Sequence, residues 1–280
     1  MIKKILVALD TDTDTPVATQ YATDIARRYN AEVIGLGVVD MGSIEASSRG
    51  GGIGSMYLME KVQANLTAEA RAVARQLTET FREAMKGSGV AYTTQVEEGV
   101  PFERIVEDMK YHDLLIVGKD PHFFYSHPEE KTKTLVQVVK NTIGPTLVVP
   151  DVYRPVRRIL VAYDASNPSA RAMRRLVHLQ PFGTDLVVEI LNVHTKSEQE
   201  GSNLALRMAK SYMDAHGYST QISSIHGTDP AREIVDYVQR FEADVVVAGA
   251  HSVSKLTKVA FGSTTASLLE GCPVPLLLDS

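Results

Sequence analysis

The sequence of 280 residues has no tryptophan and only one cysteine, Cys272. A single cysteine excludes an internal disulfide and favours a reducing compartment, so we expect a cytoplasmic protein. Aromatic residues amount to 6% of the chain, which disfavours a surface that stacks the bases of single-stranded nucleic acid. No apolar run approaches the roughly 20 residues that span a bilayer, and no signal-peptide pattern follows Met1, so no membrane partner is expected.

An excess of positive charge is also missing, because the formal net charge is −5. Proteins that bind the phosphate backbone need a basic face, so nucleic acid is not expected as the main partner. The G-x-S-x-G and H-E-x-x-H patterns are absent, and we predict no catalytic residue. His122, His127 and Glu129 could ligate a metal, but loop histidines with this spacing are common on surfaces, and we predict no metal site.

What the sequence does contain is one pattern that occurs twice. ILVALD at Ile5–Asp10 recurs as ILVAYD at Ile159–Asp164, and DLLIVG at Asp113–Gly118 recurs as DVVVAG at Asp244–Gly249. Two further pairs follow in the same order: Glu98–Pro101 with Gly227–Pro230, and Gly144–Val149 with Cys272–Leu277. Ordered repeats of this kind indicate a duplication. The boundary falls near Asp151–Pro155, so we predict one domain over residues 1–152 and a second over residues 153–280.

Each copy alternates strand-like and helix-like segments. Second strands are predicted at residues 33–39 and 186–193, and third strands at residues 92–96 and 220–225. Thr15-Pro16 and Asn167-Pro168 each predict a helix start, with an N-cap followed by proline at the first helical position. This alternation indicates an α/β fold in which helices cover a parallel sheet. The apolar segments at residues 146–149 and 276–278 are predicted to be edge strands, which invite pairing.

The most informative stretch runs from Val245 to Thr265. A β-branched run ends at Gly249, and Gly262-Ser263-Thr264 opens a helical pattern. Glycines let the backbone approach an anion, and the free N–H groups of a helix start point at it. The spacing Gly249-x2-Ser252-x9-Gly262-Ser263 resembles the G-x2-G-x9-G-[ST] nucleotide signature of the universal stress protein family, with serine at the second glycine. The chain is therefore similar to a tandem member of that family.

The resemblance implies both a fold and a ligand. Each half would be an adenine-nucleotide-alpha-hydrolase-like domain, with a five-stranded parallel sheet of order 3-2-1-4-5 flanked by helices. The fifth strands of the two halves would pair with each other. The ligand would be ATP, ADP or AMP, with or without Mg²⁺. It would bind beyond the carboxyl ends of strands 1 and 4, where the strand order reverses.

The resemblance also implies a role for each site residue of the second half. Asp164 would lie near the ribose or the base, and Val193 beside the adenine. The phosphates would be held by Gly249, Ser252, Gly262, Ser263 and Thr264. Structural explanations compete with these roles: Asp164 could cap the next turn, Val193 could belong to the core, and Gly249 could serve a tight turn. Lys255 and Lys258 could complement phosphate charge or be solvated.

The first half departs from the signature. Gly118 is present, but Pro121 occupies the second glycine position, and the loop Lys119–Tyr125 is bulky and aromatic. Lys131-Thr132 or Thr132-Lys133 stands where the second half has Gly262-Ser263. Proline removes a donor N–H, and large side chains crowd the approach to the backbone. We therefore predict that this half does not bind nucleotide, despite Asp10.

The resemblance implies a stress-response protein that is regulated by nucleotide occupancy, and His251 would support at most slow ATP hydrolysis. A homodimer of tandem chains and an unidentified regulatory protein are the implied partners. Two alternatives stay open. The chain could have lost nucleotide binding and act through protein–protein interaction, which Ser252 would favour. It could also be an ATP-using enzyme on a related fold, although Asp164-Ala165-Ser166-Asn167 lacks the S-G-G-x-x-S loop of nucleotidyl transferases.

Overall fold

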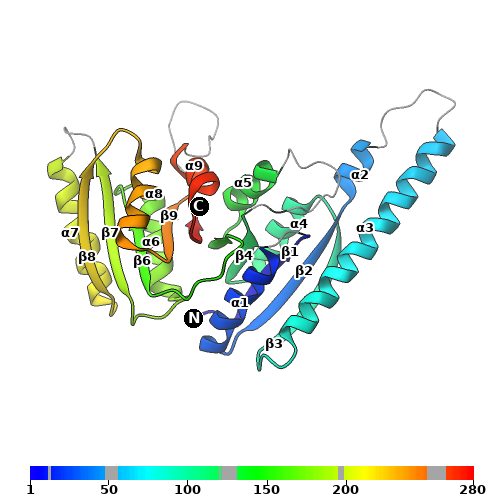
Figure 1. Cartoon of the computed structure of the whole chain (residues 1–280), viewed down its shortest axis with the longest axis horizontal. Coiled ribbons are helices and arrows are strands. Elements are labelled where there is room, and N and C mark those ends of the chain that lie inside the picture. Colours follow the sequence, from blue (N-terminus) through cyan, green and yellow to red (C-terminus); the bar gives the residue numbers. More distant parts are fainter. Residues whose placement is uncertain (12–13, 48–55, 120, 122–130, 195–198, 251–262) are drawn as a thin grey trace. The chain divides into compact units, whose positions relative to one another are not determined.

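The computed structural model describes residues 1–11, 14–47, 56–119, 121, 131–194, 199–250 and 263–280 (Figure 1). Within this part of the chain, the residues form two compact units. One unit comprises Lys3–Val138, and the other comprises Met1–Ile2 together with Val139–Ser280. Each unit is an α/β structure, as the alternation of strand-like and helix-like segments predicts.

The unit Lys3–Val138 holds a parallel sheet of order β3-β2-β1-β4. Its strands are β1 (Lys4–Leu9), β2 (Glu32–Asp40), β3 (Ala91–Gly99) and β4 (Leu114–Gly118). Its helices are α1 (Thr15–Tyr29), α2 (Met41–Ser47), α3 (Met56–Met85), α4 (Pro101–Asp108) and the short 3-10 helix η1 (Met109–Tyr111). The apolar run of β1 is buried on both faces, since Ile5, Leu6 and Val7 are fully covered. Helix α5 (Lys131–Asn141) crosses the division between the units.

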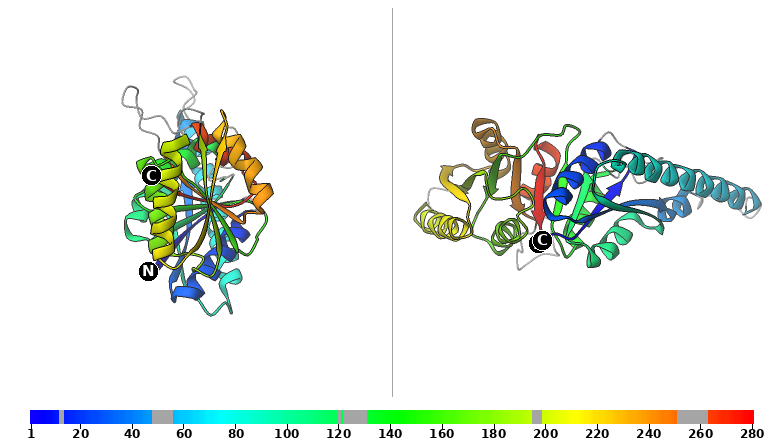
Figure 2. Two further views of the ribbon diagram at one scale, coloured as in Figure 1. Left: turned by 90° about the vertical axis from the view of Figure 1, so that its left-hand side faces the viewer. Right: turned by 90° about the horizontal axis from the view of Figure 1, so that it is seen from below.

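The second unit holds a sheet of order β5-β10-β9-β6-β7-β8. Its strands are β5 (Thr146–Val149), β6 (Arg158–Ala162), β7 (Val187–His194), β8 (Ser219–His226), β9 (Val245–Gly249) and β10 (Leu276–Asp279). Its helices are α6 (Asn167–Leu179), α7 (Gln199–Ala215), α8 (Pro230–Phe241) and α9 (Ser263–Gly271). In Figure 2, α7 and α8 lie on opposite faces of this sheet. Read from β8 to β10, the five parallel strands confirm the expected order 3-2-1-4-5.

Strand β5 pairs with β10, as the resemblance implies. The pairing is antiparallel, with Leu276 opposite Val148 and Leu278 opposite Thr146. The last strand of the first repeat is therefore part of the compact unit that contains the second repeat. This pairing explains why the units divide between residues 138 and 139 and not at the predicted repeat boundary.

The predicted helix starts are one residue too late. The N-caps of α1 and α6 are Asp14 and Ser166, so Thr15 and Asn167 already belong to the helices. Ser166 has the extended backbone of a capping residue, and its side chain accepts a hydrogen bond from the Ser169 N–H. Asp14 has a helical backbone and no capping bond from its side chain. Its carboxylate lies against Gly118 at the end of β4 instead.

Helix α3 is 30 residues long, whereas its counterpart α7 has 17. The described buried positions of α3 recur every three to four residues, at Thr67, Ala70, Ala74, Thr78, Phe81 and Met85. This stripe covers β2 and β3. Within the described ranges, no helix, α3 included, is both long and apolar enough to cross a membrane.

Candidate functional site

Those predicted site residues of the second half that the structure describes lie at or near one edge of the sheet. Strands β6 and β9 are parallel neighbours, so their carboxyl ends lie at the same edge. Gly249 is the last residue of β9, and Asp164 follows the end of β6 by two residues. The strand order reverses between these two strands, which is where open α/β sheets bind ligands. Ser252 and Gly262, and with them His251, Lys255 and Lys258, lie outside the described residues.

A hydrogen bond joins the end of β9 to the first turn of α9. Helix α9 begins at Ser263, which is exposed, and Thr264 is half-buried. The hydroxyl of Thr265 is buried and donates to the carbonyl oxygen of Gly249 over 2.9 Å. The structure therefore brings the N-terminus of α9 to the end of β9. The sequence interpretation assigned no role to Thr265, because a threonine inside a helical pattern carries no special signal.

Gly249 also has a packing role. A Cβ atom on this residue would lie 2.5 Å from the carbonyl carbon of Pro168 and 2.6 Å from the nitrogen of Ser169. Both atoms belong to the backbone of the first turn of α6. Only glycine lets β9 and α6 approach this closely. The structural explanation for Gly249 is therefore well supported, and the glycine alone does not establish a ligand.

Asp164 forms a local turn before α6. Its Oδ1 accepts a hydrogen bond from the Ser166 N–H over 2.9 Å. Partial burial acts to raise the pKa of Asp164, but hydrogen bonds from Ser166 and Ser169 outweigh it, so the pKa lies below 3.8. Ala165, between Asp164 and Ser166, has φ of 63°, a left-handed conformation that costs a non-glycine residue about 1–2 kcal/mol. Strained backbone of this kind concentrates at functional sites.

Val193 and two histidines lie at the carboxyl ends of β7 and β8. Val193 is half-buried, and its Cγ1 would lie 3.0 Å from a Cβ atom on Gly227. His194 ends β7 and is buried, while His226 ends β8 and is exposed. Their rings are nearly perpendicular, with centroids 6.3 Å apart. The sequence interpretation missed both histidines, because each stands at a strand end without a recognisable motif.

The corresponding edge of the first unit carries three buried carboxylates: Asp10, Asp14 and Asp40. Asp10 accepts a hydrogen bond from the Thr15 hydroxyl over 2.8 Å. Asp40 accepts from both the N–H and the hydroxyl of Ser43. A Cβ atom on Gly118 would overlap the carboxylate of Asp14, so that side chain lies directly against the end of β4. The Pro121 and Lys131 region, on which the sequence prediction relied, is only partly within the described ranges.

In the second unit, the positions of these carboxylates are occupied differently. Asp164 corresponds to Asp10 in the repeat, and Ser166 corresponds to Asp14 as the N-cap of the following helix. His194 corresponds to Asp40 as the last residue of the second strand. One carboxylate thus remains where the first unit has three. Among the described residues, no group of three or more histidine, cysteine, aspartate or glutamate side chains could hold a metal ion.

Comparisons with known proteins agree with the tandem repeat and the fold of each domain. The model of the universal stress protein family matches twice, at residues 1–150 and 155–279. A universal stress protein of Synechocystis sp. is 22% identical over 259 residues, which cover 92% of this chain and 87% of that protein. The crystal structure of a universal stress protein from Archaeoglobus fulgidus is similar with a TM-score of 0.68 and 17% identity, and covers 99% of this chain and 96% of that one. A putative universal stress protein from Pseudomonas aeruginosa gives a TM-score of 0.65 at 17% identity, with coverage of 99% and 93%. The chain belongs to the universal stress protein family, as a member with two such domains in tandem.

Proposed function

We propose that this protein binds one adenine nucleotide per chain, as ATP in preference to ADP or AMP, in its second domain. The nucleotide regulates the protein by its presence or absence, as part of a stress response. We place the domain boundary between residues 152 and 153, so that the binding domain comprises residues 153–280. The observation that carries the proposal is the contrast in charge between the two corresponding sheet edges.

The difference in negative charge decides how strongly each edge would repel the phosphates of a nucleotide. In the first domain, Asp10, Asp14 and Asp40 are each at most 7% exposed, so solvent screens their charges poorly. Two like charges 4 Å apart repel each other by about 4 kcal/mol at an effective dielectric constant of 20. The phosphates of a nucleotide at this edge would be repelled by several carboxylates at once. At the corresponding three positions of the second edge, Asp164 is the one carboxylate, and Ser166 and His194 add no negative charge. A further buried carboxylate at this edge, that of Asp279 at the end of β10, is paired with Arg175.

The second edge also supplies donors. The N–H groups of Ser263 and Thr264 lie in the first turn of α9, where the helix itself supplies no acceptor and its dipole favours an anion. The hydrogen bond from Thr265 to Gly249 holds this turn close to the end of β9. We assign the phosphates to Gly249, Ser252, Gly262, Ser263 and Thr264. We assign the ribose or base to Asp164 and the adenine to Val193.

Isothermal titration calorimetry with ATP tests the proposal. We expect one site per chain in the wild-type protein. Gly262→Val places a branched side chain where the phosphates would lie, and it should abolish binding while the circular dichroism spectrum is unchanged. Lys131→Ala changes the corresponding position of the first domain, and it should leave the affinity unchanged. Two sites per chain, or normal affinity in Gly262→Val, would refute the assignment.

A second candidate is a protein that has lost nucleotide binding and acts through protein partners. Ser252 favours it, because serine resists the positive φ that glycine adopts without strain. The packing role of Gly249 favours it as well, since that glycine would persist without a ligand. Denaturing the purified protein and identifying any released nucleotide by mass separates the two candidates. The homodimer of tandem chains and the regulatory protein partner stay predictions.

A further inference from the structure

Strand β10 holds the residue that follows the glycine of β9. Asp279 is opposite Gly249 in the parallel pairing of β10 with β9. One residue further, the Ala250 N–H donates to the carbonyl oxygen of Asp279 over 2.9 Å. Ala250 is the last described residue before the segment that carries Ser252 and Gly262. The backbone of Asp279 therefore holds Ala250, the first residue after β9.

The side chain of Asp279 is tied to helix α6. Its Oδ1 accepts a hydrogen bond from Nε of Arg175 over 3.2 Å. The aspartate side chain is only 5% exposed, whereas that of Arg175 is 41% exposed. One turn earlier on the same helix, Nε of Arg171 donates to the carbonyl oxygen of Ser280 over 3.1 Å. Two arginines of α6 thus hold two consecutive residues at the end of β10.

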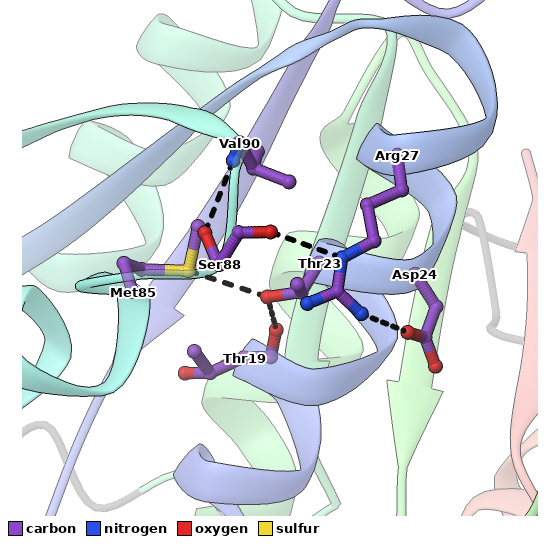
Figure 3. A network of polar contacts seen from close by, with 7 residues as sticks. All are labelled: Thr19, Thr23, Asp24, Arg27, Met85, Ser88 and Val90. Atoms are coloured by element: carbon purple, nitrogen blue, oxygen red, sulfur yellow. Dashed lines mark hydrogen bonds and ion pairs between the residues drawn. The ribbon is translucent and has the colours of Figure 1, made fainter.

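Among the described residues of the first repeat, threonines occupy the corresponding helix positions. Arg171 and Arg175 stand three and seven residues after Pro168, and the same distances from Pro16 lead to Thr19 and Thr23. The Thr19 and Thr23 hydroxyls donate to carbonyl oxygens of their own helix, and the Thr23 hydroxyl also contacts the sulfur of Met85 (Figure 3). The last residue of β5 is apolar Val149, whereas the last residue of β10 is Asp279. The ion pair between half-exposed Arg175 and buried Asp279 therefore occurs in the repeat that carries the glycine signature.

This ion pair does not lower the free energy of the folded state. Burial raises the pKa of Asp279 above 3.8, and the charges of Arg175 and Arg171 lower it by less. The ionised carboxylate is therefore a net cost to the folded state at neutral pH. Replacing a buried ion pair with apolar residues is often neutral or stabilising. The first repeat, with threonine and valine at these positions, shows that the strand and helix form without the pair.

We propose that Asp279 and Arg175 are positioning residues for the nucleotide loop. By holding the end of β10 against α6, they fix the carbonyl oxygen that orients Ala250 and hence the start of the segment that binds the phosphates. The expected effect of these two residues on ATP affinity rests on the proposed function. Their effect on Ala250 does not depend on a nucleotide.

Asp279→Asn tests the inference, because it removes the charge and keeps the shape of the side chain. We expect the dissociation constant for ATP, measured by calorimetry, to rise at least about tenfold, which is about 1.4 kcal/mol. We expect hydrogen exchange of the Ala250 amide, measured by NMR on the nucleotide-free protein, to become at least about tenfold faster. The thermal midpoint should stay unchanged or rise, because ionised Asp279 is a net cost to the folded state.

Two further variants serve as comparisons. Arg175→Lys keeps the positive charge and should retain most of the affinity, while Arg175→Met removes the charge and should behave like Asp279→Asn. Glu242→Gln is the control. It breaks the ion pair between Glu242 and Arg158, whose atoms are 3.1 Å apart, and Arg158 begins β6 at the opposite edge of the sheet. Neither ATP affinity nor Ala250 exchange should change in it.

The outcomes separate the two proposals. Unchanged exchange at Ala250 in Asp279→Asn overturns the inference, whatever the affinity. Faster exchange with unchanged ATP affinity also overturns it, because Ala250 would then be held without consequence for the ligand. If the wild-type protein binds no ATP, the proposed function fails, and faster exchange in Asp279→Asn still supports the positioning of Ala250.

Discussion

Gly249→Ala is the substitution with the clearest structural cost. The added Cβ atom would lie 2.5, 2.6 and 2.7 Å from the carbonyl carbon of Pro168, the nitrogen of Ser169 and the Cβ of Pro168. Two of these three atoms are backbone atoms of α6, so no rotation of a side chain can relieve the overlap. The helix has to move away from β9. Helix α6 also carries Arg175, so the same movement disturbs its bond to Asp279.

The size of the effect follows from overpacking. Forcing an extra carbon into a close-packed contact typically costs about 1–3 kcal/mol. For a protein of this size, each kcal/mol lowers the thermal midpoint by about 2–4 °C, so we expect a decrease of about 2–12 °C. Urea unfolding followed by circular dichroism should show the same loss of free energy. A loss of ATP binding in this variant would then reflect displaced structure and would not demonstrate a phosphate contact.

Gly118→Ala provides the matched comparison. There the three atoms nearest to the added Cβ atom all belong to the carboxylate of Asp14, which is a side chain. In a double-mutant cycle, Asp14→Ala should therefore relieve most of the cost of Gly118→Ala. Pro168→Ala should relieve little of the cost of Gly249→Ala, because the two backbone atoms remain. Wild-type stability of Gly249→Ala, or its full rescue by Pro168→Ala, would refute the reasoning.

Three further outcomes are expected. Residues 153–280 expressed alone should form a homodimer in light scattering, because β10 loses β5 and its edge can pair with a second copy; a stable monomer would contradict this. Because the pKa of Asp164 is lowered in the folded state, its contribution to stability is present above 3.8 and is lost as the pH falls through the folded value. The difference in unfolding free energy between wild type and Asp164→Asn should therefore be constant from pH 5 to 7 and shrink below 3.8, and a difference that grows on acidification would contradict it. ATP hydrolysis should be far slower than the typical enzyme rate of about 10 per second, and an ordinary rate that is lost in His251→Ala would overturn the regulatory proposal.

The repeats and strand order could be predicted because their signals are local or shared between the halves. The run Ile159–Asp164 identifies a buried strand by its own composition, and its likeness to Ile5–Asp10 locates the duplication. The helix starts were wrong by one residue, because Asp14 and Thr15 are both good capping residues and the sequence does not choose between them. The length of α3, 30 residues, could not be predicted either, because a glycine-rich stretch precedes the helix.

The electrostatic contrast between the two edges could not be predicted. Asp14 lies in the run Thr-Asp-Thr-Asp-Thr-Pro, which is typical of a solvated turn. Its burial depends on Gly118, about a hundred residues later, which leaves room for its carboxylate. Asp279 presents the same difficulty, because its role depends on Gly249 in the neighbouring strand and on Arg175 in α6. Such roles arise from tertiary contacts, which periodicity does not report.

The antiparallel pairing of β5 with β10 sets the order in which the chain can fold during synthesis. Leu276 pairs with Val148 and Leu278 with Thr146, which are separations of 276 − 148 = 128 and 278 − 146 = 132 residues. At a synthesis rate of about 5–20 residues per second, β5 waits roughly 6–26 seconds for its partner. During that time the apolar edge Leu147–Val149 lacks the strand that covers it, and unpaired edges of this kind recruit other chains. A nascent chain stalled before Leu276 is therefore exposed to aggregation, and chaperones that bind extended apolar segments should retain it until β10 emerges.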